Sequence, residues 1–110
     1  MDYRAILQNH FDMIVGKQLT ELHLACEMMM FSFEEYELHT QCLTRIVCEN
    51  DILVTTLDYQ NWDGENEKHN DMWYNLARHI DLLINKKVIK TQLTDTNDLL
   101  IWLESDVCIQ

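Results

Sequence analysis

Apolar side chains follow a helical spacing in two stretches of the chain. In residues 2–15 they recur every three or four positions, at Tyr3, Ile6, Leu7, Phe11 and Ile14. A second stretch, from a helix-capping Asn70 or Asp71 to residue 84, has the same spacing at Trp73, Leu76, Ala77, Ile80, Leu83 and Ile84. Side chains at this spacing share one face of a helix. The sequence therefore predicts two helices, and we expect the second to pack on the sheet.

Each predicted helix ends at a residue that enters the left-handed backbone region at low cost. Gly16 ends the first helix and Asn85 the second, and the two lie 69 positions apart. The alignment resumes beyond this turn with one extra residue, so that residues 29–34 match residues 99–104. We interpret residues 2–34 and 71–104 as two αββ-like units. A chance likeness between amphipathic patterns is the alternative.

After each turn the apolar positions alternate with polar ones, which indicates half-buried strands. One strand carries Leu22 and Leu24, and the next carries Met29, Phe31 and Phe33. A hairpin over residues 36–58, made of strands 36–48 and 51–58, and a polar loop over residues 59–70 follow, before strands at 87–94, 98–103 and 106–110. The predicted class is α+β, a single domain over residues 1–110 with two helices and an antiparallel sheet or half-barrel of about six or seven strands.

Acidic residues outnumber basic ones by nineteen to eight, which gives a formal charge of -11. Nucleic acid and anionic membranes would repel this field, so we expect neither as a partner. The surplus acid either keeps a small domain soluble or attracts a basic protein. For the second reading the candidate binding residues are the acids of a predicted turn and of the polar loop, with two aromatic anchors: Glu34, Glu35, Glu37, Asp63, Glu65, Glu67, Asp71, Tyr59 and Trp62.

The sequence contains no motif of an enzyme active site. It has two glycines and therefore no glycine-rich phosphate loop, and no His-Glu-x-x-His sequence. His23-x-x-Cys26 and His39-x-x-Cys42 offer four soft metal ligands, but residues three apart on a strand point to opposite faces, which disfavours zinc. We expect no catalysis, metal or cofactor. The polar group His39, Gln41, Arg45 and Asp58 is interpreted as a hydrogen-bonded network that fixes strand register.

Neither a membrane span nor a signal peptide is predicted. No apolar run approaches the roughly 20 residues that a transmembrane helix needs, and the first residues lack the basic start and apolar stretch of a secretory signal. We expect a cytoplasmic protein. The four cysteines are then expected to be reduced thiols.

Four segments together resemble a known group of proteins. They are Leu38-His-Thr-Gln-Cys-Leu-Thr-Arg-Ile46, Ile52-Leu-Val-Thr-Thr-Leu-Asp58, Lys86-Lys-Val88 and Asp98-Leu-Leu-Ile101. This pattern resembles small bacterial proteins of the immunity-protein type, which are encoded beside secreted or contact-dependent toxin domains. The resemblance implies an antitoxin that binds and neutralises a cognate toxin domain, of which a basic nuclease such as an RNase is the expected kind. It supplies no catalytic residues.

Two other classes of function remain open. A regulatory or oligomeric binding module is one, and the strand after Asp106 would let it form a homodimer by edge pairing. A small metal-dependent hydrolase that uses His39, Arg45 and Asp58 is the other. Light scattering would reveal the first and metal analysis the second.

Overall fold

The computed structural model describes residues 3–25, 28–57 and 80–110. This part of the chain contains one α-helix, two short 3-10 helices and eight strands. In chain order the elements are α1 (Tyr3–Phe11), η1 (Asp12–Ile14), β1 (Leu19–Ala25), β2 (Met28–Phe33), β3 (Tyr36–Thr40), β4 (Arg45–Cys48), β5 (Asp51–Thr55), η3 (Ile80–Leu82), β6 (Val88–Leu93), β7 (Leu99–Leu103) and β8 (Val107–Ile109).

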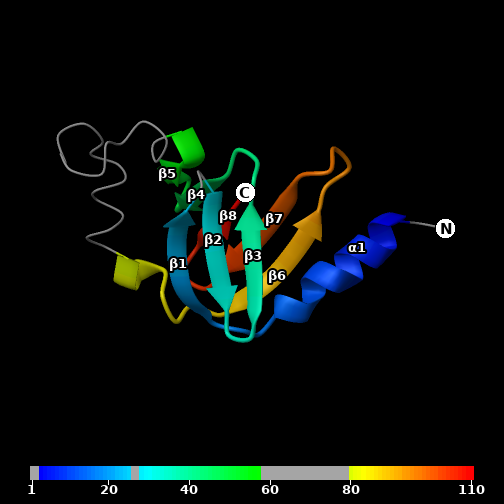
Figure 1. The fold of residues 1–110 in the computed structure, drawn as a ribbon, viewed down its shortest axis with the longest axis horizontal. Coiled ribbons are helices and arrows are strands. Elements are labelled where there is room, and N and C mark those ends of the chain that lie inside the picture. Colours follow the sequence, from blue (N-terminus) through cyan, green and yellow to red (C-terminus); the bar gives the residue numbers. More distant parts are fainter. Residues whose placement is uncertain (1–2, 26–27, 58–79) are drawn as a thin grey trace.

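The strands form two antiparallel sheets that lie one in front of the other (Figure 1). The front sheet has the order β1-β2-β3, and the back sheet has the order β5-β4-β8-β7-β6. The α+β class is confirmed, but the described residues form eight strands rather than six or seven, in two sheets rather than one. The core lies between the sheets, where Phe31 and Phe33 of β2 meet Ile101 and Leu103 of β7 in one buried cluster.

The prediction of one continuous strand over residues 36–48 is wrong. Its first part is β3 in the front sheet and its second part is β4 in the back sheet, with residues 41–44 crossing between them. In the sequence, apolar or hydroxyl-bearing side chains recur at every second position from Leu38 to Ile46, although Cys42 among them is exposed. A period of two therefore gives no sign that the chain changes sheets. The hairpin of β4 and β5 itself forms as expected, with Glu49 and Asn50 at positive φ in its turn.

The turns that end the two predicted helices pair with each other. Gly16 and Asn85 have φ of 85° and 70°, which confirms their left-handed conformation. Gln18 and Lys87 form an isolated antiparallel bridge between them. Four backbone hydrogen bonds of 2.7 to 2.9 Å surround this bridge, from Gly16 to Val88, from Asn85 to Leu19, from Leu19 to Lys86 and from Val88 to Lys17. Adding 69 to the residue number in the first segment and subtracting 69 in the second turns each of these bonds into another of the four. The bridge therefore lies on a local two-fold axis.

The same correspondence extends into the strands. In the front sheet the register of β1 and β2 shifts between Leu19 and Glu21, and in the back sheet the register of β6 and β7 shifts between Val88 and Lys90. A bulge at equivalent positions bends both strand pairs alike. These shared irregularities support the interpretation of two related units, because an amphipathic pattern does not itself require a bulge.

The first helix packs with its polar side, contrary to expectation. No residue of α1 is buried, and Tyr3 and Ile6 are 72% and 50% exposed. Instead, the Gln8 side-chain amide donates to the Thr91 carbonyl at 3.1 Å and accepts from the Leu93 backbone N–H at 2.8 Å. This pair of bonds occupies the free edge of β6 as a neighbouring strand would, which protects that edge from further pairing.

The second predicted helix and the polar loop lie almost entirely outside the described residues, and η3 is the described part of that helix. No helix among the described ranges has the length and apolar character needed to cross a bilayer.

Candidate protein-interaction site

Acidic side chains collect at the end of the molecule that contains the two-fold axis. The hairpin turns β2–β3, β7–β8 and β4–β5 meet there. The Glu49 backbone N–H donates to the Asp106 carbonyl at 3.2 Å, which joins the second and third turns. We call the six exposed acids of these turns the acidic end; they are Glu34, Glu35, Glu49, Asp51, Glu104 and Asp106.

Two carboxylates of the acidic end hold the backbone at the two-fold axis. Glu34 accepts a hydrogen bond from the Gln18 backbone N–H at 2.8 Å, and Glu104 accepts one from the Lys87 backbone N–H at 2.7 Å. Gln18 and Lys87 are the residues of the central bridge, so the two bonds are equivalent. Glu34, predicted as a binding residue, therefore has a structural contact, and its equivalent Glu104 was not predicted.

The other two predicted acids of the first turn also have partners. The Lys17 ammonium lies 2.9 Å from Glu35. This hydrogen bond lowers the pKa of Glu35 and raises the pKa of Lys17, so both stay charged near neutral pH. Glu37 lies on β3, where its carboxylate is 3.3 Å from His39.

The environment of Cys48 reports the negative field of the acidic end. Burial raises the pKa of this thiol, and the nearby carboxylates Glu49, Asp106 and Asp51 raise it further, while Lys86 lowers it. These three acids were not predicted as site residues. Each lies in or beside a turn, and only the sheet topology brings their turns together.

Two carboxylate–histidine pairs stand on the outer face of the front sheet. Glu21 and Glu37 lie on either side of Ser32, and His23 and His39 lie on either side of Met30, across strands β1, β2 and β3. Along β1, His23 is 2.8 Å from Glu21, which mirrors the pair on β3. All four side chains are exposed, so the two pairs form matched polar groups on this face.

The predicted polar network is not assembled as one unit. His39 contacts Glu37, whereas the Arg45 Nε donates to the Gln110 side-chain oxygen at 2.8 Å in the other sheet. Gln41 lies in the crossing segment and is exposed, and Asp58 lies outside the described residues. The reason is again the change of sheet between β3 and β4, which separates His39 from Arg45.

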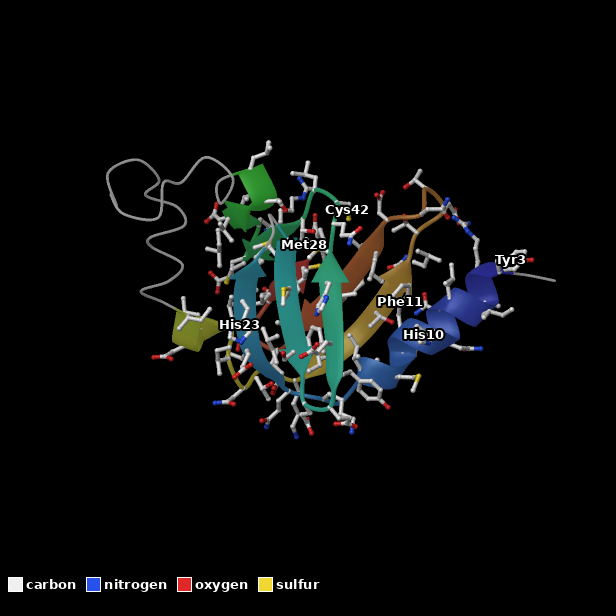
Figure 2. The ribbon with its side chains drawn as sticks, viewed as in Figure 1. Tyr3, His10, Phe11, His23, Met28 and Cys42 are labelled. Carbon is white, nitrogen blue, oxygen red and sulfur yellow. The ribbon has the colours of Figure 1, made fainter. Side chains whose placement is uncertain are left out.

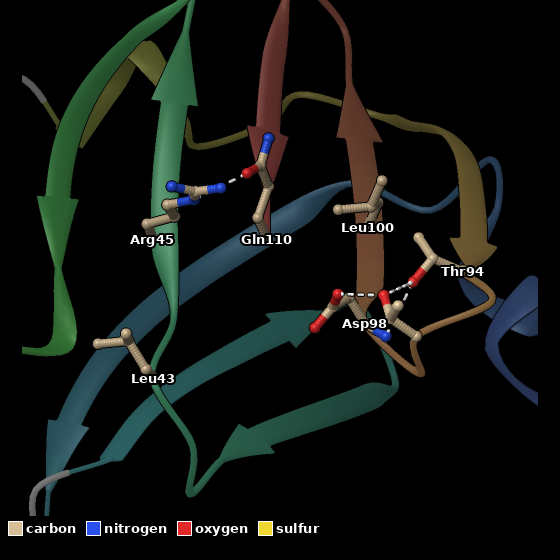
Figure 3. Close-up of a pocket in the computed structure, with 7 residues that line it drawn as sticks. Leu43, Arg45, Thr94, Asp98, Leu100 and Gln110 are labelled. Atoms are coloured by element: carbon tan, nitrogen blue, oxygen red, sulfur yellow. Dashed lines mark hydrogen bonds between the residues drawn. The ribbon is translucent and has the colours of Figure 1, made fainter.

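An open pocket lies at the opposite end of the molecule from the two-fold axis. It has a volume of about 520 Å³ and lies between β4, the β6–β7 turn and the end of the chain. Figure 3 shows Arg45 and Gln110 bonded on one side and Asp98 with Thr94 on the other. The Asp98 carboxylate accepts from the Thr96 hydroxyl at 2.8 Å. These polar groups satisfy one another's hydrogen bonds.

The arrangement of histidines and cysteines gives little support to a metal centre. His23 and His39 are separated by the full width of β2, Cys42 is exposed near the start of the crossing segment (Figure 2), and Cys26 lies outside the described residues. In the part of the chain that the structure describes, no three side chains of metal-binding type come together. The loop residues Tyr59, Trp62, Asp63, Glu65, Glu67 and Asp71 also fall outside it.

Comparison of the chain with protein-family models, curated proteins and solved structures found no match.

Proposed function

We propose that this chain is an immunity protein that binds a basic toxin domain and blocks its activity. The observation that carries the proposal is the acidic end, where three turns carry six exposed carboxylates. The same region contains three lysines, Lys17, Lys86 and Lys87, so the acids outnumber the bases there. A nuclease binds its substrate with a basic cleft, and a surface of opposite charge is attracted to such a cleft and competes with phosphate.

The rigidity of the acidic end also supports the proposal. Two of its turns are joined by the hydrogen bond from the Glu49 backbone N–H to the Asp106 carbonyl. Glu34 and Glu104 fix their own turns to the backbone of the Gln18–Lys87 bridge. Carboxylates on a fixed backbone lose less conformational freedom on binding than carboxylates on a mobile segment, which favours affinity. The predicted loop acids would add charge to the same attraction.

Growth protection tests the proposal. The chain is co-expressed with the toxin domain encoded beside its gene, and protected growth is expected. A variant with Glu49→Gln and Asp51→Asn should protect less, because it loses two charges of the acidic end. The control carries Asp95→Asn and Asp98→Asn, which remove the same charge from the β6–β7 turn, and it should protect fully.

Three results would contradict the proposal. They are toxicity that the chain does not relieve, equal protection by both double variants in strong and weak expression, and the absence of any toxin domain beside the gene.

The second candidate function, an oligomeric binding module, was expected to use the strand after Asp106 as its edge. That expectation is wrong, because β8 lies between β4 and β7. One specific observation still favours this function, the unpaired edge of β3 in the described sheet.

A further inference from the structure

Strand β3 presents an unpaired edge. In the described residues it pairs with β2 alone. Phe33 and Tyr36 close the two-residue hairpin, so the backbone groups of Tyr36, Leu38 and Thr40 face β2. The N–H and C=O groups of Glu37 and His39 therefore point outward, where another strand would bond to them.

The second unit shows what such an edge accepts. Strand β8 follows β7 as β3 follows β2, and its inward Ile109 takes the place of Leu38. Its other edge carries β4, where Val47 lies opposite Cys108, and Arg45 exchanges backbone hydrogen bonds of 2.9 Å with Gln110. The position that β4 occupies beside β8 is open beside β3. The scaffold thus admits a fourth strand in one unit and lacks it in the other.

We propose that a second copy of this chain fills the position, with β3 of each copy pairing antiparallel to β3 of the other. A two-fold axis at Leu38 aligns all five residues of both strands. It sets each Glu37 opposite His39 of the other copy, in the pairs that exchange backbone hydrogen bonds. An axis at Glu37 would oppose two carboxylates, which is unfavourable. The charges of β3 thus select the register centred on Leu38.

The space next to β3 suits the apolar side chains of such a neighbour. A hollow of about 120 Å³ separates β3 from the end of α1, lined mainly by Phe11, Met13, Ile14, Tyr36 and Leu38. Inward side chains of the added strand lie on the same side of the sheet as Leu38, so they cover this hollow. The resulting interface is small, and the dimer is therefore expected to depend on protein concentration.

This inference does not depend on the proposed function, and the response to salt distinguishes them. Each copy carries a formal charge of -11, so the copies repel and added salt should strengthen the dimer. Binding of a basic toxin should instead weaken with salt.

Sedimentation equilibrium of the purified protein tests the dimer. The variant His39→Glu places a carboxylate opposite Glu37 of the other copy at both ends of the interface. It should raise the dissociation constant of the dimer about tenfold or more. His23→Glu is the matched control, because His23 makes the same contact with a glutamate on the same face but lies on β1, and it should leave the constant unchanged. The double variant Glu37→Lys with His39→Glu reverses the charges and should restore the dimer.

At about 0.5 mM protein, even a dissociation constant near 1 mM gives a measurable share of dimer. A wild-type protein that is still monomeric at this concentration overturns the proposal and leaves the edge of β3 to a strand of another protein. A dimer that responds equally to both single variants, or that the double variant does not restore, also overturns it.

Discussion

The two carboxylates that hold the two-fold axis give a quantitative prediction. Replacing Glu104 with alanine removes the acceptor, 2.7 Å away, of the Lys87 backbone N–H, and replacing Glu34 with alanine does the same, at 2.8 Å, to Gln18. Hydrogen bonds to charged groups contribute about 1.5 to 3 kcal/mol when they are shielded. Both carboxylates are exposed, so water takes over part of the bond and we expect a loss of about 1 kcal/mol for each variant.

Because the two carboxylates accept corresponding bonds at the bridge, the two losses should be similar. A loss of about 1 kcal/mol lowers the melting temperature of a domain of this size by about 4 °C. Urea unfolding followed by circular dichroism measures the free energy, and a thermal scan gives the melting temperature. Glu35→Ala is the control, since Glu35 lies in the same turn but its carboxylate pairs with the half-buried Lys17 and not with a backbone N–H of the bridge. If both variants unfold like the control, the carboxylates do not support the axis and this reasoning is refuted.

Two further predictions concern the backbone and the half-buried thiol of Cys48. Gly16→Ala should lower the free energy of unfolding by about 1 kcal/mol. The loss comes from backbone strain alone, because a Cβ at this residue meets no atom within 4 Å. Asn85→Gly, at a φ of 70°, should not destabilise the protein, and urea unfolding of both variants tests the difference. The raised pKa of Cys48 means that the unfolded chain loses this proton first as pH rises. The free energy of unfolding should therefore fall from about pH 8.5 upward, and less steeply in Cys48→Ala; equal slopes would contradict this.

The sequence predicts the local features of the fold well. The left-handed residues Gly16 and Asn85, the turn at Glu49 and Asn50, and strands β6 and β7 all lie where the pattern places them. Each of these depends on residues that are close in sequence, and the backbone preference of a few residues decides them.

The features that the sequence does not predict depend on long-range contacts. The change of sheet after β3 leaves the alternation in the sequence intact, because Cys42, Thr44 and Ile46 continue it although Cys42 is exposed, and so the pattern is the same for one strand or two. The polar packing of α1 depends on Gln8 meeting the edge of β6, which is distant in sequence. For the same reason the acids Glu49, Asp51 and Asp106 could not be assigned to one site before the turns were placed.

The central claim is that negative charge on a rigid end of this protein attracts a basic protein. Stopped-flow measurement of the association rate constant with the neighbouring toxin domain, over a series of salt concentrations, tests it most directly. We predict a rate constant that falls steeply as salt rises, with a flatter dependence for Glu49→Gln/Asp51→Asn and for neutralised loop acids. A rate constant that is independent of salt, or equally steep in all these variants, would contradict the claim.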